Sequence, residues 1–449
     1  MSIGPTDLDA GSIFPSFQPC QIDEVELSEP LPVLEARMGP TGAPYSRSRI
    51  LVRVHGQPIG LVEVTLDPRA PAGRVAHAID ETLRPQLADH LVADHLAADR
   101  IDLLPMVRGD GITAGKPPAC LGQPLDLEIA PLVSVVVPTH SRSDQLPLTL
   151  TSLLANNYPR FEIVVVDNNP SDPDVRELVE IYHRDDRRVR YVREWSQGLS
   201  RARNTGYLFT RGEIVAFTDD DVTVDRSWIT SLVIPFVEDP EVTCVTGLVL
   251  AGRLDTEVQL RFEEAAAFNK GFRRRVFDLA EHRPASPLFP LTAAVMGTGA
   301  DFAVRKSALG DLWQFDPALG AGTIAAGGED MDFFAELMFD GHRLVYEPRA
   351  LVWHTHVDDQ AQMHSKMHSY GIGFSAYLTK QLVQGSGRRL QMLRVVPAGL
   401  AYALRPHSRH DPRRTTHSSR SVLLAELRGM ARGPWAYFRS RLHNAWLTD

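Results

Sequence analysis

Cysteine is scarce in this sequence, whose 449 residues include only Cys20, Cys120 and Cys244. The three cysteines lie far apart and in no CxxC spacing, which excludes a small domain stapled by disulfides. A few scattered cysteines, odd in number, are typical of proteins from a reducing compartment. We therefore expect three inert thiols.

Long hydrophobic runs are also missing. The nearest approach to one, residues 395–404, contains Pro397 and is shorter than the roughly 18 apolar residues that a membrane-spanning helix needs. Residues 1–14 lack a basic segment followed by an apolar run, so we expect no signal peptide. With 43% hydrophobic and 23% charged residues, the composition excludes wholesale disorder and a collagen-like repeat. We expect a cytoplasmic globular protein.

The net charge of −9 is unevenly distributed. Residues 380–449 contain thirteen Lys and Arg against three Asp and Glu, so a basic tail follows an acidic body. This asymmetry argues against a protein that binds nucleic acid throughout, and it favours a polyanion or a membrane surface next to the tail. Within 385–449, the side chains expected to contact an anionic membrane peripherally, at its inner face, are Arg388, Arg389, Arg394, Arg413, Arg414, Leu423, Leu424, Trp435 and Phe438.

Composition and periodicity divide the chain into four zones. Residues 1–45 are rich in Pro, Gly and Ser, which predicts a loose N-terminal segment. Residues 46–125 combine alternating strand patterns with an amphipathic helical stretch, in which Pro85 predicts a kink or a break. This zone is expected to be a small α+β accessory domain. Residues 131–375 form the main domain, and residues 376–449 are a basic helical extension.

The main domain alternates nearly continuous apolar runs with helical patterns. The predicted strands lie at 133–137, 163–166, 189–192 and 214–218, with helices near 143–154, 173–183 and 199–209 between them. Apolar strands that alternate with helices predict a mostly parallel, doubly wound sheet with helices on both faces, which is an α/β fold. In such sheets ligands bind beyond the carboxyl ends of the strands.

Polar residues follow three of these predicted strands, in the segments PTH (138–140), DNN (167–169) and DDD (219–221). Crowding three carboxylates together is costly unless a cation neutralises them. Because alternate side chains of an extended segment point the same way, Asp219 and Asp221 can share one ion. Carboxylate oxygens favour Mg²⁺ or Mn²⁺, which also accept diphosphate oxygens. An acidic surface turn is the alternative.

The segment QGLSRARNTG (197–206) begins a predicted helix. Arg201 and Arg203 offer bidentate donors to phosphate, and Asn204 can share a helix face with Arg201. The alternative is a solvated helix face.

Two more polar elements lie downstream. A glycine-rich stretch ends in EDMD (329–332) at the start of a predicted helix. A carboxylate placed there can deprotonate an incoming hydroxyl, although the helix dipole alone also favours acids at this end. In WHTH (353–356), the spacing places His354 and His356 on one side of a strand, where one of them could complete the metal shell.

In their order along the chain, these elements resemble the family 2 glycosyltransferases, which have the GT-A fold. The resemblance runs from about Val133 to His356, half of the chain. VSVVVPTHSR is similar to the family's opening strand and nucleotide-contacting loop, VVVDNN to its second strand, GLSRARNTG to its donor-binding helix and FTDDDV to its metal-binding DxD motif. GTGADFAVRK, GGEDMDF and VWHTH follow in the family's order, while His140 stands where the family often has an aromatic residue.

The resemblance implies transfer of a sugar from a nucleotide-diphosphate-sugar donor to a hydroxyl acceptor, with inversion at the anomeric carbon. The acceptor could be a glycan, a lipid carrier or a metabolite. Carried over by position, Asp330 is the implied general base, and Glu329 or Asp332 could share or replace that role.

The resemblance also implies a divalent cation, Mn²⁺ or Mg²⁺, that stabilises the leaving nucleoside diphosphate. The ligands that it implies are Asp219 and Asp221, with His354 or His356 as a further ligand. The donor-binding residues that it implies are Pro138, Thr139, Asp167, Arg201, Asn204 and Asp220.

Two other classes of function compete with this interpretation. A nucleotidyltransferase can share a similar sheet and a carboxylate-bound Mg²⁺, but it should carry a glycine-rich phosphate loop after its first strand. The segment PTHSRSDQ lacks those glycines. A catalytically silent scaffold that binds a nucleotide sugar is the second class, and the intact acidic and histidine motifs argue against it.

Overall fold

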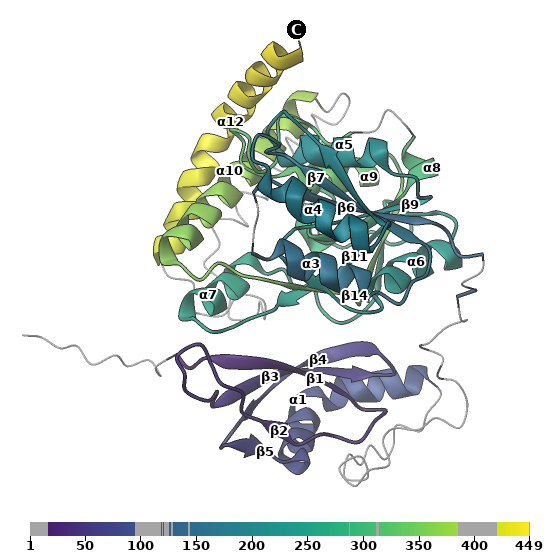
Figure 1. The fold of residues 1–449 in the computed structure, drawn as a ribbon, viewed down its shortest axis with the longest axis vertical. Coiled ribbons are helices and arrows are strands. Elements are labelled where there is room, and N and C mark those ends of the chain that lie inside the picture. Colours follow the sequence, from purple (N-terminus) through teal and green to yellow (C-terminus); the bar gives the residue numbers. More distant parts are fainter. Residues whose placement is uncertain are drawn as a thin grey trace, which may run out of the picture.

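In the computed structural model, two units of different size share the chain (Figure 1). The structure describes residues 17–94, 118, 120, 125, 126, 129–141, 144–286, 288–310, 314–384 and 420–448. A small N-terminal sheet with one helix lies beside a larger sheet that has helices on both faces. The larger sheet carries the motifs that sequence analysis singled out.

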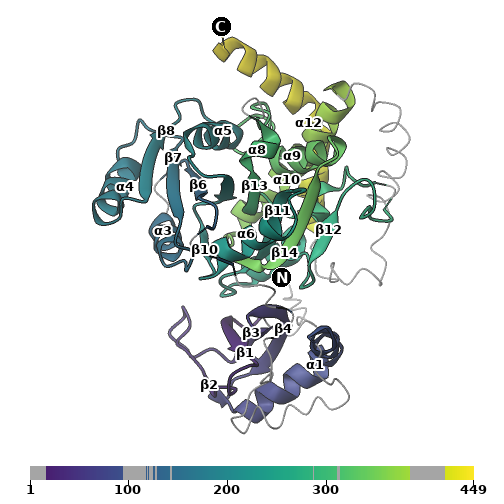
Figure 2. The same ribbon diagram turned by 90° about the vertical axis from the view of Figure 1, so that its right-hand side faces the viewer.

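The N-terminal unit is built on a three-stranded sheet in the order β1-β3-β4. Its elements are β1 (Cys20–Glu26), β2 (Leu34–Glu35), β3 (Arg47–Val54), β4 (Gln57–Thr65), β5 (Arg69–Ala70) and α1 (Ala72–Ala93). Helix α1 buries an apolar stripe at one-turn spacing against the sheet, comprising Val75, Ile79, Leu83 and Leu87. It continues through Pro85, and its two halves point in different directions, which agrees with the predicted kink (Figure 2).

The structure differs from the expected loose segment at residues 1–45. Strand β1 lies within that segment and pairs in parallel with β3, and β2 pairs with β5. The parallel pairing explains why the segment looked loose, because the partner of β1 lies beyond a stretch rich in Pro and Gly rather than across a short hairpin.

The large sheet has nine strands in the order β10-β14-β11-β13-β9-β6-β7-β8, and β12 pairs with β14. Its strands are β6 (Val133–Thr139), β7 (Phe161–Asp167), β8 (Val189–Arg193), β9 (Ile214–Thr218), β10 (Val222–Val224), β11 (Val242–Ala251), β12 (Arg275–Phe277), β13 (Asp301–Arg305) and β14 (Arg343–His354). Strands β9, β6, β7 and β8 are parallel, as are β11 and β14. The remaining pairings are antiparallel. The predicted α/β class is confirmed, and the parallel half is the half that the sequence pattern predicted.

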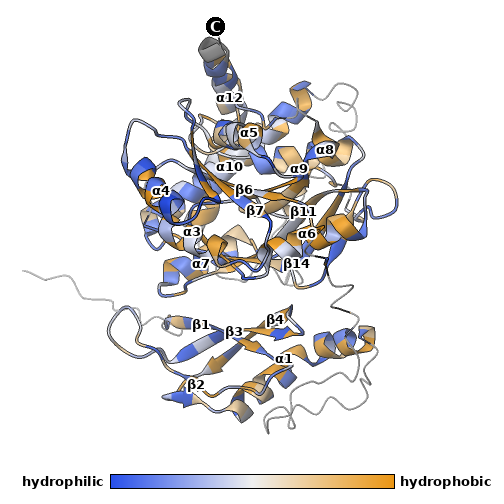
Figure 3. Cartoon of the chain, turned by 45° about the vertical axis from the view of Figure 1, so that its right-hand side comes forward, coloured by the Kyte–Doolittle hydropathy of each residue, from blue (hydrophilic) through white to orange (hydrophobic). Residues whose placement is uncertain are grey.

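Helices cover both faces of this sheet. They are α3 (Leu146–Leu154), α4 (Asp174–Asp185), α5 (Leu199–Phe209), α6 (Trp228–Glu238), α7 (Glu257–Ala266), α8 (Lys306–Leu309) and α9 (Glu329–Phe339), with the short 3₁₀ turn η3 (Ala293–Val295). Side chains of α3, α4 and α6 pack into one core, and those of α5 and α9 pack into the other. Helix α6 is largely hydrophobic and α4 largely hydrophilic, so α4 is the more solvent-facing helix (Figure 3).

Two long helices, α10 (Gln360–Gln384) and α12 (Arg420–Thr448), pack side by side at the edge of the large unit (Figures 1 and 2). Glycines allow their backbones to approach closely. A Cβ added to Gly371 would lie 2.0 Å from the carbonyl oxygen of Glu426, and one added to Gly429 would lie 2.1 Å from that of His368. Basic residues 388, 389, 394, 413 and 414 of the predicted membrane contact lie outside the described residues. None of the helices in the described ranges combines the length and the apolar character needed to cross a bilayer.

The close helix approach can be tested with Gly429→Ala. Alanine has the higher helix propensity by ~1 kcal/mol, but its Cβ would collide with backbone, and overpacking costs about 1–3 kcal/mol. We therefore expect a lower Tm in thermal unfolding. The matched control is Gly73→Ala in the first turn of α1, where nothing lies within 4 Å of an added Cβ, and this variant should not lose stability. A raised Tm for Gly429→Ala would contradict the observed packing.

Candidate functional site

The site is built where parallel strands end together. Strands β6 and β7 are in register from Val133 and Phe161 to Thr139 and Asp167, so the last residues of both strands lie side by side. The Thr139 hydroxyl then donates to Asp220 Oδ2 over 2.5 Å, which ties the end of β6 to the acidic segment after β9. The structure therefore brings together three segments that the sequence placed after separate strands.

The acidic segment of Asp219, Asp220 and Asp221 connects β9 to β10. Burial, with the charge of Asp221 as a further cause, raises the pKa of Asp220 to about 6, although the Thr139 hydrogen bond acts in the opposite direction. Burial also raises the pKa of Asp219 and of Asp221, and the other two aspartates add to the effect on Asp219. The side chains of Asp219 and Asp221 stay 30% and 31% exposed. Since crowded carboxylates resist ionisation, a cation that they can reach would be attracted strongly.

Arg203 of α5 is the buried cation of the site, with an exposed fraction of only 1%. One guanidinium nitrogen donates to Glu329 Oε1 over 2.9 Å, and the other lies 3.4 Å from Asp219 Oδ1 and donates to the Gly299 carbonyl over 2.9 Å. Arg203 thus joins the end of β9, the start of β13 and the start of α9.

Asp330 occupies the first turn of α9, beside Gly299. Its Oδ2 accepts from the Gly299 N–H over 2.9 Å, and its Oδ1 accepts from the Met331 N–H over 2.8 Å. An added Cβ at Gly299 would lie 2.9 Å from Arg203 Nη2 and 3.2 Å from Asp330 Cβ. Glycine is therefore needed here for space, and the two contacts place Asp330 next to the Arg203 cluster.

The two other acids of the EDMD segment have partners inside the protein. Glu329 is buried and pairs with Arg203. Asp332 is buried on the side that faces α10, where it pairs with Lys380 and accepts from Gln381 over 2.9 Å. Of the three acids, Asp330 alone is only partly buried.

His354, at the end of β14, faces the acidic segment. Its Nε2 lies 3.5 Å from Asp221 Oδ1, and its Nδ1 is 3.0 Å from His356 Nδ1. His356 Nε2 in turn lies 2.6 Å from Glu263 Oε2 of α7. Burial, followed by the charges of His356 and Lys366, lowers the pKa of His354 to about 3, so this imidazole is neutral. A neutral imidazole with an available lone pair can bind a divalent metal.

Helix α10 adds two residues that sequence analysis did not select. The charge of Lys366 lowers the pKa of Asp220 and Asp221. Burial raises the pKa of Tyr370 strongly, and Asp330, Asp219, Asp221 and Glu329 act in the same direction. The phenol of Tyr370 therefore lies within electrostatic range of these four carboxylates. No local pattern in the sequence marks these residues, because their position depends on how α10 packs.

The structure directs Arg201 and Asn204 away from the acidic residues. Arg201 donates to Asn444 of α12 over 2.8 Å. Asn204 donates to the Phe315 carbonyl over 2.9 Å and accepts from the Phe315 N–H over 2.8 Å. Arg203, which the sequence offered as an equal candidate for phosphate, is the residue that α5 points into the cluster.

Asp167 is fully buried at the end of β7, beside the predicted donor residues Pro138 and Thr139. Its Oδ2 accepts from the Tyr191 hydroxyl over 2.6 Å, and its Oδ1 accepts from the Asn169 N–H over 2.9 Å. These hydrogen bonds fix the orientation of the carboxylate. Its remaining lone pairs can still accept hydrogen bonds from a ligand.

Several known proteins are similar to parts of this chain. Residues 134–286 match the model of glycosyl transferase family 2. A pre-mycofactocin glycosyltransferase from Mycobacterium tuberculosis is 30% identical over 224 residues, which cover 50% of this chain and 43% of that protein. A glucosyl-dolichyl phosphate glucuronosyltransferase from Haloferax volcanii is 34% identical over 121 residues, which cover 26% and 38%. The chain thus spans less than half the length of these curated relatives.

Among solved structures, a mannosyltransferase from Pyrobaculum calidifontis in complex with GDP-Man and Mn²⁺ aligns with a TM-score of 0.44 and 18% identity, covering 70% of this chain and 91% of that one. The family match includes β6 from its second residue, the strands β7 and β9, and the acidic segment that follows β9, whereas Asp330 and His354 lie beyond its last residue. The matched region, residues 134–286, is thus similar to glycosyl transferase family 2.

Proposed function

We propose that this chain transfers a sugar from a nucleotide-diphosphate-sugar donor to a hydroxyl acceptor, with inversion and with the help of a divalent cation. The observation that carries this proposal is that Asp219, Asp221 and His354 gather where strands β9 and β14 end, close to Asp330. We call these strand ends the sheet edge. Gly299 lies between the two groups, because its carbonyl accepts from Arg203 and its N–H donates to Asp330.

The residues at this edge fit a hard divalent cation. Asp221 Oδ1 is buried and has no hydrogen-bond partner, although it lies near His354 Nε2. An unsatisfied buried carboxylate oxygen is costly, and a bound ion would remove that cost. Carboxylate oxygens from Asp219 and Asp221 with one imidazole suit Mn²⁺ or Mg²⁺. When bound, such an ion supplies charge that stabilises the leaving diphosphate.

Of the two histidines, His354 is the proposed ligand. If Glu263 accepts a hydrogen bond from the N–H of His356 Nε2, then His356 Nδ1 accepts one from the N–H of His354 Nδ1. A lone pair then remains on His354 Nε2 toward Asp221. A carboxylate that orients a ligating histidine in this way, here through a second histidine, is a common outer-shell arrangement. His356 and Glu263 are therefore positioning residues.

Asp330 is the proposed general base. Its neighbours Glu329 and Asp332 are committed to Arg203 and Lys380, which leaves Asp330 as the carboxylate of this segment that can accept a proton from the acceptor hydroxyl. Inversion follows from direct attack by that hydroxyl on the anomeric carbon, as the leaving diphosphate departs on the opposite side. The guanidinium of Arg203 already contacts Glu329, Asp219 and the Gly299 carbonyl, so its proposed role is to position Asp219 and Glu329.

Donor contacts are proposed for Pro138, Thr139, Asp167 and Asp220, which line the ends of β6, β7 and β9. Arg201 and Asn204 contribute to donor binding in this proposal only through the segments that they hold, α12 and the backbone at Phe315. These polar residues lie at the carboxyl ends of the strands, which is where open α/β sheets bind ligands.

A thermal-shift screen tests the donor and the cation together. The protein is heated with UDP-, GDP-, dTDP- or CDP-sugars, each with Mn²⁺ or with EDTA, and a ligand that binds the folded state raises the Tm. We expect a metal-dependent rise for one nucleotide. His354→Ala should weaken the affinity for Mn²⁺, and with it the metal-dependent rise in Tm. His356→Ala should lower the affinity for Mn²⁺ by roughly 10–100-fold or less, as for other outer-shell residues.

Exposed His77 on α1 provides the matched control, because its side chain is 77% exposed and His77→Ala should leave the donor shift unchanged. A folded wild-type protein with no shift for any donor would favour the silent scaffold. A larger loss for His356→Ala than for His354→Ala would overturn the assignment of the ligand.

The general base can be tested with Asp330→Asn. We expect kcat/KM for release of the nucleoside diphosphate, with water as surrogate acceptor, to fall by roughly 10²–10⁴-fold, while the donor-induced rise in Tm persists. Asp340→Asn at the opposite, exposed end of α9 is the control and should retain activity. Unaltered turnover in Asp330→Asn would remove Asp330 from the base role.

Helix α12 is proposed as a peripheral contact with an anionic membrane at its inner face. Its exposed apolar side chains are Leu423, Leu424, Leu427, Trp435, Phe438 and Leu442. Exposed Arg428, Arg432 and Arg439 accompany them, and the Arg439 guanidinium lies 5.6 Å from the Trp435 ring centre. Apolar side chains with flanking arginines are typical of helices that lie in a membrane interface.

This contact predicts that Trp435→Ser combined with Phe438→Ser weakens binding to phosphatidylglycerol vesicles by roughly tenfold or more, since two large apolar side chains would no longer leave water. Vesicle co-sedimentation measures the effect. Ile181→Ser is the control, because Ile181 is 50% exposed on α4, and it should bind like wild type. Equal binding to vesicles of phosphatidylcholine alone, or no loss in the double variant, would contradict the proposal.

A further inference from the structure

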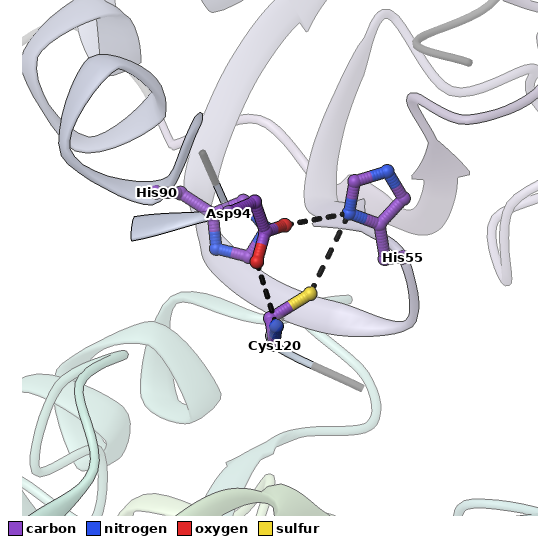
Figure 4. Close-up of side chains that lie close together, drawn as sticks. All are labelled: His55, His90, Asp94 and Cys120. Atoms are coloured by element: carbon purple, nitrogen blue, oxygen red, sulfur yellow. Dashed lines mark hydrogen bonds and ion pairs between the residues drawn. The ribbon is translucent and has the colours of Figure 1, made fainter. Parts of the chain in front are cut away.

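Four side chains that can ligate a metal meet in the N-terminal unit, apart from the sheet-edge site. His55, His90, Asp94 and Cys120 each place one ligand atom so that all four atoms lie within 4.8 Å of one another (Figure 4). Among the described residues, this is the group of histidine, cysteine and acidic side chains that lies close enough together to hold one ion.

Three separate chain segments supply these residues. His55 sits in the turn between β3 and β4, and His90 and Asp94 lie one turn apart at the end of α1. Cys120 is fixed by two backbone contacts: its N–H donates to Asp94 Oδ1 over 2.6 Å, and its carbonyl accepts from Gln57 over 2.9 Å. The sequence separation between these segments explains why scattered cysteines looked inert.

The ligand atoms converge on one point. Asp94 Oδ2 lies 2.9 Å from His55 Nδ1 and 3.2 Å from His90 Nε2, and Cys120 Sγ lies 3.5 Å from His55 Nδ1. The side chains of Asp94, His55 and His90 are only 0%, 6% and 12% exposed. His90 Nε2 is buried and makes no hydrogen bond of acceptable geometry. A buried imidazole nitrogen that lies 3.2 Å from a carboxylate oxygen without a hydrogen bond is costly, and a bound ion would remove that cost.

A catalytic thiol is a less suitable explanation for this cluster. A Cys-His-Asp relay uses the two ring nitrogens of the histidine in series, one toward the nucleophile and the other toward the carboxylate. Here Cys120 Sγ and Asp94 Oδ2 both approach the same nitrogen, His55 Nδ1. Such convergence on one atom suits a shared ion rather than a proton relay.

We propose that His55, His90, Asp94 and Cys120 bind one Zn²⁺ ion as a closed structural site. Two imidazoles, a thiolate and a carboxylate form a four-ligand set that zinc favours, whereas Mg²⁺ and Mn²⁺ prefer oxygen ligands. With Zn–N near 2.0–2.1 Å and Zn–S near 2.3 Å, ligand atoms around a tetrahedral ion lie roughly 3–4 Å apart. The observed separations of 2.9, 3.2 and 3.5 Å match this spacing.

The position of the site indicates what the ion would do. It would fasten the β3–β4 turn, the end of α1 and the chain at Cys120, 26 residues beyond Asp94. Arg349 of β14 lies close enough to influence the charge of Cys120, and Arg53, next to the turn, pairs with Asp225 of the large unit over 2.7 Å. The ion would thus hold the N-terminal unit together at its border with the large sheet.

Metal analysis of the full chain, without an affinity tag and purified without added metal, tests the site. Mass spectrometry of the metal content should find about one zinc per chain, and Cys120→Ser and His90→Ala should each reduce it at least ~10-fold. His77→Ala on the same helix and Cys20→Ser in β1 are matched controls that should retain zinc. Asp219→Ala should also retain it, which separates this site from the one at the sheet edge.

A second readout covers the case in which a variant fails to fold. Wild-type protein stripped by a chelator should show a lower Tm that Zn²⁺ restores and Mg²⁺ does not. Reconstitution with Co²⁺ should give a thiolate-to-cobalt charge-transfer band. Wild-type protein that holds no zinc after reconstitution and shows no cobalt band would overturn the proposal, as would unchanged zinc content in a folded Cys120→Ser variant.

Discussion

The site depends on the pairing of the buried Arg203 guanidinium with the groups around it. A buried guanidinium must be paired and hydrogen-bonded, because leaving one uncompensated costs several kcal/mol. Its partners are Glu329, Asp219 and the Gly299 carbonyl, which come from three segments that are far apart in the sequence. The rings of Phe302 and Phe315 lie 5.8 and 5.6 Å from its guanidinium carbon and complete its surroundings. Any shift of α5 would therefore move the end of β9 and the start of α9 together, and with them Asp219 and Asp330.

One arginine does not neutralise this cluster. Asp219, Asp220, Asp221 and Glu329 all have raised pKa values, with burial as the main cause in each case. Folding alone thus leaves these carboxylates poorly stabilised in their charged form, which is a stability cost. Functional sites often carry such a cost because it is recovered when a ligand binds. A cation attracted to this edge would lower the pKa values again, so its binding and the ionisation of the aspartates are coupled.

Much of this arrangement could be predicted from local pattern. The predicted helix at 199–209 and strand at 214–218 coincide with α5 and β9, because apolar strands and glycine-flanked helices carry strong local signals. The choice between Arg201 and Arg203 could not be made in the same way. Two residues apart on a helix, they point about 200° apart, and only the packing of α5 decides which faces the sheet. Strand β1 was missed for a similar reason, since its partner β3 is not its neighbour in a hairpin.

The two proposed metal sites differ in ways that follow from how their residues reach them. At the sheet edge, Asp219 and Asp221 come from one short segment and His354 from the strand beside it, and the carboxylates keep exposed surface that substrate oxygens can use. The N-terminal cluster draws four different side chains from three segments and leaves little of its side-chain surface exposed. Oxygen ligands with open positions suit an ion that must bind and release substrate. A nearly closed set with nitrogen and sulfur suits an ion that stays. Ligand type and exposure are thus the basis for proposing chemistry at the site of the large unit and structural support at the site of the small one.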